Sequence, residues 1–270
     1  MTFPPRPALQ YVAIGVYVVL LAGVFLFPSV PLPSWPGGTV AWNMYATVHG
    51  VCAQMHNTMI GGMQLPLCAR NTGIYGAMTI SLLAMWALGR IRTRTFPPVW
   101  MTILLLIPVL IVAIDGLNSL FVDLEMPYLY TPRNQLRTLT GAMAGIAIAP
   151  FFVPLFNRVL RCNPKETPVM ANAVDLIVLW GLAFCFSMLV IIGPAWSYWP
   201  IAIISWLGIV GILLISNGFA VAVAFGYDQR VAHVRELAAP VLVATAITIA
   251  ELGLMSWLRF GFEVNGFFQS

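Results

Sequence analysis

The sequence predicts an all-helical, polytopic integral membrane protein with seven transmembrane helices and one interfacial amphipathic helix. Hydrophobic residues make up 60% of the 270 residues, and charged residues only 8%. Soluble domains carry about 25% charged residues, so this chain could not cover a water-facing surface. Seven apolar stretches have roughly the 20 residues that cross a bilayer. They lie at about 9–29, 72–90, 98–117, 138–157, 173–193, 200–225 and 238–258.

The ends of these stretches fit transmembrane helices. The apolar run from Leu9 to Val30 exceeds the roughly 7–15 residues of a signal-peptide core, so we predict a retained span. Pro98, Pro200 and Pro240 stand near the start of later spans, where proline removes no helical hydrogen bond. In the fourth span, the small residues Gly141 and Gly145 form a motif typical of closely packed membrane helices.

The arginines and the single lysine give the orientation. Seven crossings divide these basic residues into a set of nine and a set of four. The larger set is Arg6, Arg90, Arg92, Arg94, Arg158, Arg161, Lys165, Arg230 and Arg235, and the smaller is Arg70, Arg133, Arg137 and Arg259. Cytoplasmic loops collect basic residues. We therefore expect an integral cytoplasmic (inner) membrane protein with a cytoplasmic N-terminus and an extracytoplasmic C-terminus. This bias also explains the net charge of +4 without a nucleic-acid partner.

Within one membrane domain, 1–270, two long segments are predicted on the extracytoplasmic side. They are residues 31–71, between the first and second spans, and residues 118–137, between the third and fourth. Loops beyond about 12–15 residues are often functional. Because both segments fall on the same face, we expect the functional site there.

The first of these segments contains Cys and His at helical spacing. Apolar residues recur through 39–57 as in an amphipathic helix, which would lie in the membrane interface. On such a helix His49, Cys52 and His56 share a face of roughly 60°. Gly61 and Gly62 then allow the chain to turn back and bring Cys68 near.

Three interpretations of Cys52 and Cys68 remain open. The two residues form a structural disulfide, because an outer compartment is oxidising. Alternatively, His49, Cys52, His56 and Cys68 hold zinc or another transition metal. The third interpretation is a pair of redox-active thiols.

A polar cluster is expected beside these residues, at the outer ends of three helices. Charged groups at membrane depth usually pair with each other, so Asp115 should contact Arg70 or Arg137. Such ion pairs either lock loops to helices or line a polar pocket. The predicted cluster is Arg70, Asn71, Asp115, Asn118, Asn134 and Arg137.

Glu251 lies inside the predicted seventh span. An acid at that depth is either a functional residue or a protonated carboxyl group hydrogen-bonded to a neighbouring helix.

Two blocks carry a family resemblance, Cys52-Ala53-Gln54 and the run from Leu65 to Tyr75, LPLCARNTGIY. They resemble the uncharacterised membrane family called domain of unknown function 2085, over roughly 45–160. The resemblance implies a membrane protein and no known reaction. Ala53 stands where that family has His, and Asn71 where it has Cys, which favours a Cys52–Cys68 disulfide over a metal site.

The sequence therefore favours a membrane scaffold or accessory subunit, in contact with the lipid bilayer and other membrane subunits. Its extracytoplasmic cluster would bind a metal or small cofactor. One alternative is an outer-face thiol-redox or metal-dependent enzyme, and another is a small transporter around Glu251. Neither the reaction nor the cofactor follows from the residues alone.

Overall fold

A computed structural model describes residues 35–52 and 54–265. The chain forms two compact units. In its described part, the first unit comprises 35–51, 156–164 and 210–265, and the second comprises 52, 54–155 and 165–209. The predicted first span, 9–29, lies outside the described residues.

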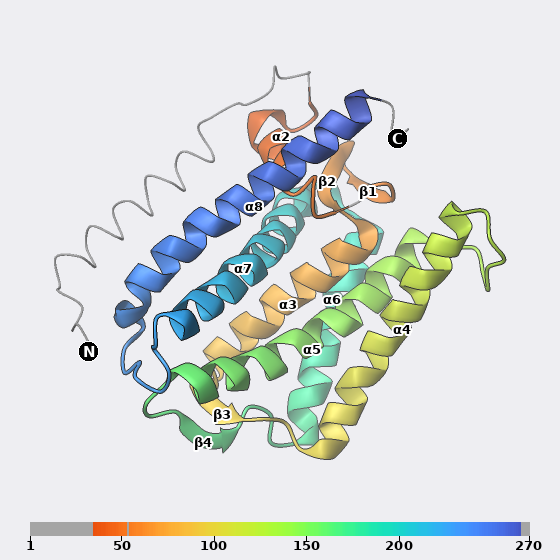
Figure 1. Ribbon diagram of the computed structural model, residues 1–270. Coiled ribbons are helices and arrows are strands. Elements are labelled where there is room, and N and C mark those ends of the chain that lie inside the picture. The colour runs from red at the N-terminus through yellow and green to blue at the C-terminus, as the bar shows by residue number, and fades with distance from the viewer. Residues whose placement is uncertain (1–34, 53, 266–270) are drawn as a thin grey trace. The chain divides into compact units, whose positions relative to one another are not determined.

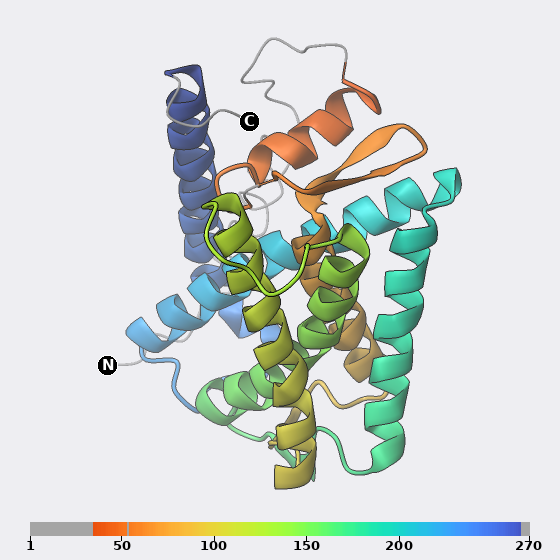
Figure 2. The same ribbon diagram turned by 90° about the vertical axis from the view of Figure 1, so that its right-hand side faces the viewer.

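The second unit is a helical bundle with a small pair of strands at each end of α3 (Figures 1 and 2). The strands at one end are β1 and β2, and those at the other are β3 and β4. Its elements are β1 (Asn57–Ile60), β2 (Met63–Cys68), α3 (Ala69–Ala87), β3 (Thr93–Thr95), α4 (Val99–Asp123), the start of α5 (Asn134–Leu160), β4 (Lys165–Pro168), α6 (Ala173–Ile192), a 3-10 turn (Ala195–Ser197) and the start of α7 (Tyr198–Ala224).

The first unit contains the far ends of α5 and α7 and two further helices. It consists of α2 (Gly38–Thr47), the end of α5, the end of α7, a 3-10 turn (Val234–Leu237) and α8 (Ala238–Val264). α2 packs against α8, and the rings of Trp42 and Phe260 lie 6.3 Å apart at this contact (Figure 1).

Five helical segments in the described residues are long and apolar enough to cross a membrane. They are Val99–Asp123, Asn134–Leu160, Ala173–Ile192, Ala195–Ala224 and Val234–Val264. These match the predicted third to seventh spans, which confirms a mostly helical protein with several candidate spans.

The predicted second span, 72–90, corresponds to α3, which is not among those five segments. α3 buries small and polar residues, including Thr72, Gly76 and Ser81, against the helices of its unit. A helix covered by protein does not need the uniformly apolar surface of a lipid-facing one. That α3 crosses the membrane therefore stays a prediction.

The glycines of α5 let α3 approach closely, as their spacing predicted. A Cβ atom on Gly145 would lie 2.1 Å from the carbonyl oxygen of Ile74, and one on Gly141 would lie 2.4 Å from that of Arg70. Both separations are far below van der Waals contact. The position of α3 beside α5 thus depends on the absence of side chains at these two residues.

We expect Gly145→Ala to destabilise the second unit by about 1–3 kcal/mol, the usual cost of overpacking. Gly181→Ala in α6 is the matched control, because nothing lies within 4 Å of a Cβ there. Thermal unfolding of the detergent-solubilised protein measures both. Equal melting temperatures for the two variants would contradict this packing.

The predicted helix over 39–57 is wrong at its end, and its amphipathic, interfacial character stays a prediction. α2 ends at Thr47, ten residues before the predicted end, and it buries four consecutive residues, Ala41 to Met44. Gly50 explains the end, since its N–H donates to Ser256 Oγ at 3.2 Å and a Cβ there would lie 2.3 Å from the Met255 backbone. The chain after Thr47 is shaped by this close contact with α8.

A tight hairpin follows. β1 and β2 pair antiparallel, with Ile60 opposite Met63 and Asn57 opposite Cys68. Gly61 and Gly62 have φ values of 57° and 78°, so both occupy the left-handed region that a two-residue hairpin turn demands. The predicted reversal at these glycines is confirmed.

Candidate functional site

The thiols of Cys52 and Cys68 meet at the start of α3, although no disulfide joins them. The Cys52 Sγ accepts hydrogen bonds from the backbone N–H of Cys68 at 3.3 Å and from Asn71 Nδ2 at 3.2 Å. Gln54 Nε2 donates to the carbonyl oxygen of Pro66 at 2.6 Å, which fixes the chain after Cys52 on the hairpin. Cys52 is 2% exposed, whereas Cys68 is partly exposed.

The two thiols differ in acidity. A hydrogen bond from the Cys68 side chain lowers the pKa of Cys52, although burial opposes the shift, and N–H donors from Cys68, Gln54 and Asn71 add to the lowering. The resulting pKa is about 6. The same hydrogen bond, together with burial, raises the pKa of Cys68. Near neutral pH the pair therefore holds one proton, with the thiolate on Cys52.

The predicted metal ligands belong to two different units. His49 belongs to the first unit, and Cys52, His56 and Cys68 belong to the second. His56 Nε2 faces Asp123 Oδ1 at 3.4 Å. No group of three or more His, Cys, Asp or Glu residues among the described positions is arranged to hold a metal ion. The shared helix face that suggested a metal does not form, because α2 ends before all three residues.

His49 has a separate environment in the first unit. Its ring stacks on Phe260 at 4.1 Å, and its Nε2 lies 2.9 Å from Glu263 Oε2. Arg259 pairs with the same carboxylate at 3.0 Å and also donates to the carbonyl oxygen of His49. These contacts tie the segment after α2 to the end of α8.

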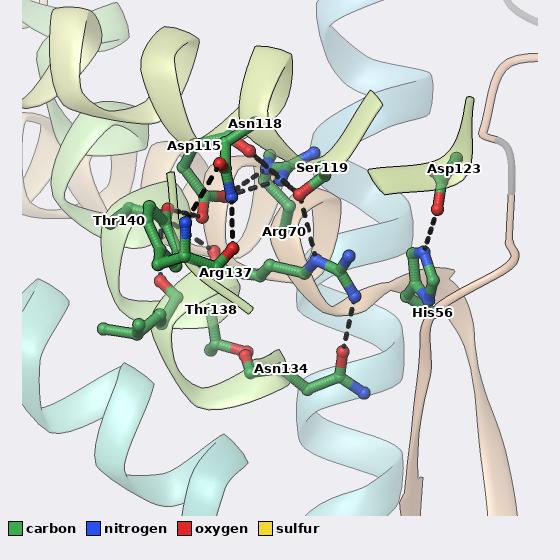
Figure 3. A network of polar contacts seen from close by, with 12 residues as sticks. His56, Arg70, Asp115, Asn118, Ser119, Asp123, Asn134, Arg137, Thr138 and Thr140 are labelled. Carbon is green, nitrogen blue, oxygen red and sulfur yellow. Dashed lines mark hydrogen bonds and ion pairs between the residues drawn. The ribbon is translucent and has the colours of Figure 1, made fainter. Parts of the chain in front are cut away.

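The polar cluster in the second unit centres on Asp115, which is 1% exposed. Arg70 Nε and Nη2 donate to Asp115 Oδ2 at 2.9 and 2.5 Å, and Nη2 also reaches Ser119 Oγ at 2.7 Å. The Tyr130 hydroxyl donates a hydrogen bond to Asp115 Oδ1 at 2.5 Å. The Arg70–Asp115 contact is one of the two pairings expected from the sequence (Figure 3).

Asn118 holds the loop between α4 and α5. Its Oδ1 accepts the N–H of Leu129 at 2.7 Å, and its Nδ2 donates to the carbonyl oxygen of Tyr130 at 2.8 Å. The loop is shorter than predicted, because α4 continues to Asp123. These hydrogen bonds of Asn118 therefore hold Tyr130 where its hydroxyl contacts Asp115.

Arg137 lies in the first turn of α5 and is 5% exposed. Its Nη1 donates to Asn134 Oδ1 at 3.2 Å and its Nε to Ser119 Oγ at 3.4 Å (Figure 3). Asn134 Nδ2 in turn donates to the carbonyl oxygen of Asn57 at 3.3 Å. The cluster thus reaches from α5 to the hairpin that carries Cys68.

Glu251 is in α8 of the first unit, where Asn217 Nδ2 donates to its Oε2 at 2.8 Å and to Thr248 Oγ1 at 3.0 Å. This matches the interpretation of Glu251 as a carboxyl group hydrogen-bonded to a neighbouring helix. No pattern in the sequence indicates Asn217 as the partner of Glu251.

Comparison with known proteins supports the resemblance carried by the thiol segment and the polar cluster. Residues 52–151 match the family described as "Predicted membrane protein (DUF2085)". The matched region contains both thiols and all six residues of the polar cluster. Uncharacterized protein MJ1492 of Methanocaldococcus jannaschii is 29% identical over 115 residues, covering 42% of this chain and 68% of that protein. No solved structure matches the chain.

Some residues of the site were not predicted. Ser119 accepts a hydrogen bond from Arg70, and Tyr130 donates one to Asp115. Asn57 lies opposite Cys68 on the hairpin. Ser119 follows Asp115 by four residues on one helix, so helical periodicity could have identified it. Asn57 could not be identified in this way, because its place opposite Cys68 depends on the pairing of the two strands and on a register shift between Asn57 and Met59.

Proposed function

We propose that this membrane protein carries out thiol–disulfide exchange through Cys52 and Cys68, on the extracytoplasmic side. The observation that carries the proposal is that the Cys52 Sγ accepts hydrogen bonds from the N–H of Cys68 and the side chain of Asn71, at 3.3 and 3.2 Å, which favour its thiolate. A dithiol whose reduced form is stabilised in this way is an oxidant when it is converted to the disulfide.

The exposure of the two sulfurs gives the order of steps. A substrate thiolate attacks Cys68, the partly exposed sulfur, and the bond between the two protein sulfurs breaks. The electron pair leaves on Cys52, a good leaving group because its pKa is lowered. A second substrate thiolate then attacks the mixed disulfide, forms the substrate disulfide and releases Cys68, which takes up a proton. A partner disulfide reoxidises the pair by the reverse exchange.

The assignment of the thiols to the extracytoplasmic side rests on the positive-inside rule. Within the second unit, the thiol pair lies at the start of α3, and Arg90, Arg92 and Arg94 follow its end. If these arginines are cytoplasmic, the thiols face the oxidising side, where a disulfide persists. Cysteine labelling with a membrane-impermeant reagent at the exposed positions Thr95→Cys and Leu129→Cys tests this; labelling of Thr95→Cys from outside would reverse the orientation.

Trapping a mixed disulfide tests the exchange. In Cys52→Ser the substrate should stay attached to Cys68, because the thiol that would displace it is gone. Cys68→Ser leaves only the buried Cys52 and should trap little. Mass spectrometry after incubation with a disulfide-containing peptide measures both adducts. An absence of adduct in Cys52→Ser that is folded would contradict the proposal.

A further inference from the structure

Arg137 is a buried cation without an ionic partner in the described part of the second unit. The acidic residues of that unit are Asp115, Asp123, Glu125, Glu166 and Asp175. Four of them face other basic groups, namely Arg70, His56, Arg94 and Arg90. None lies within ion-pair distance of Arg137. Asp115 and Asp123 act on its charge at longer range, and its side-chain hydrogen bonds within this unit go to neutral oxygens.

Those neutral contacts leave most of the guanidinium unused. The group has five N–H donors, and its side-chain hydrogen bonds are the two to Asn134 and Ser119, at 3.2 and 3.4 Å. Burial of a charge that is not paired carries a large free-energy cost. A planar guanidinium with donors to spare binds carboxylates or phosphates in a bidentate manner.

The Asn57 side chain, which is linked to Arg137 through Asn134, is a buried polar group without a hydrogen-bond partner among the described residues. Both polar atoms of the Asn57 side chain, Nδ2 and Oδ1, are shielded from solvent and make no hydrogen bond to the described residues. Asn134 links the two groups, because it accepts from Arg137 and donates to the carbonyl oxygen of Asn57. Buried polar atoms in folded proteins nearly always have partners, so such an amide points to a ligand.

The hairpin places this amide beside the thiols. Asn57 pairs with Cys68 in the antiparallel strands, beside a register shift between Asn57 and Met59, and Cys68 also interacts electrostatically with Arg137. The arginine, the amide and the more exposed sulfur therefore belong to one site.

We propose that Arg137 and Asn57 bind a carboxylate, and that the compound exchanging with Cys68 is a thiol or disulfide that carries this carboxylate. The second half rests on the proposed function. The guanidinium takes the negative charge, and the Asn57 Nδ2 donates a hydrogen bond to the same ligand. Binding itself requires no exchange chemistry.

S-methylglutathione, which has carboxylates and no thiol, tests the binding site alone. Calorimetry in phosphatidylcholine nanodiscs should show binding by the wild type and by Cys52→Ser. Arg137→Gln should bind more weakly by about tenfold or more, the effect of losing a charged hydrogen bond. Arg133→Gln is the matched control just before the start of α5, because Arg133 is exposed. Equal binding by Arg137→Gln and the wild type, or no binding by the wild type, would overturn the site.

Asn57→Asp tests the same site with a variant that should remain folded. It places a carboxylate next to Arg137, so it should abolish S-methylglutathione binding without lowering the melting temperature. Retained binding in this variant would contradict the site. Nanodiscs with phosphatidylglycerol distinguish the source of the oxyanion, because loss of wild-type binding there would assign the site to a lipid phosphate and overturn the carboxylate.

Exchange rates separate the two proposals. Oxidised wild-type protein should react faster with 3-mercaptopropionate, relative to 2-mercaptoethanol, than Arg137→Gln does, by about tenfold. Binding of S-methylglutathione without any exchange would remove the proposed function and keep the site. Exchange with an equal rate ratio in both proteins would keep the function and overturn the site.

Discussion

Replacing Asp115 by alanine is expected to destabilise the second unit by about 3–5 kcal/mol, the usual cost of removing one partner from a buried ion pair. The carboxylate accepts from Arg70 and from Tyr130, and it is 1% exposed. Its removal leaves the Arg70 guanidinium with Ser119 Oγ and a backbone carbonyl as its acceptors. Denaturant unfolding in mixed micelles measures the free-energy change.

Glu166→Ala supplies the control for this prediction. Glu166 also pairs with an arginine, Arg94, at 2.8 Å, but its side chain is 69% exposed. Exposed pairs contribute about 0–1 kcal/mol because water screens them. Asp115 gives a second readout, since burial and its hydrogen bond raise the pKa of Tyr130 to about 12. Similar stability losses in the two variants, or an unchanged Tyr130 pKa in Asp115→Ala, would contradict the described pairing.

The second large effect is a break in the pH dependence of the Cys52–Cys68 reduction potential at about pH 6, the pKa of Cys52 in the reduced pair. Below the break, reduction takes up two protons, and the potential should fall by ~59 mV per pH unit. Above it, Cys52 stays a thiolate, only Cys68 takes up a proton, and the slope should halve to ~30 mV. Equilibration with glutathione buffers between pH 4.5 and 8.5 measures these slopes.

Asn71→Leu tests the cause of that break. The variant removes a hydrogen bond to Cys52 Sγ at 3.2 Å, so the pKa of Cys52 should rise and the break should move to higher pH. Gln64→Leu is the control on the same hairpin, because Gln64 lies opposite Met59 and is not among the hydrogen-bond donors to Cys52. A single slope of ~59 mV through the whole range would show that Cys52 is not a thiolate at neutral pH.

Proton binding by the two thiols also makes the stability of the reduced protein depend on pH. Unfolded cysteines titrate near pH 9.0, whereas the folded pair loses its first proton at about pH 6. Between these values unfolding takes up a proton, so the stability contributed by the pair rises with pH. Above pH 9.0 the unfolded chain loses both protons while Cys68, with its raised pKa, keeps one, so that contribution falls. Thermal unfolding from pH 5 to 10 checks this maximum, which Cys52→Ser should lack.

Local sequence information predicted much of the architecture. Five of the seven apolar stretches coincide with helices long enough to span a membrane, because hydrophobicity and length are properties of each segment alone. The Gly61-Gly62 turn is similarly local, since only glycine readily takes two consecutive positive φ values. The pairing of Arg70 with Asp115 was predictable because an isolated charge in a membrane is costly.

The errors arose where distant residues decide the local structure. α2 ends at Thr47, and Gly50 packs against Met255 and Ser256, more than 200 positions away. No helical periodicity near His49 contains that information. Because the helix ends there, His49, Cys52 and His56 do not share the helix face on which the metal prediction depended. Asn57 was missed for the same reason, because its position opposite Cys68 is a consequence of the hairpin register.

A redox titration of the wild-type protein tests the central claim most directly. Samples equilibrated in glutathione buffers of graded potential are alkylated, and mass spectrometry then gives the state of each of the four cysteines. We predict that Cys52 and Cys68 convert together from two thiols to one disulfide, with a tenfold change in their ratio per ~30 mV. Cys162 and Cys185 should stay reduced or react separately. A Cys52 that remains a thiol at every potential, or a Cys52–Cys68 disulfide that no buffer reduces in the folded protein, would contradict the account.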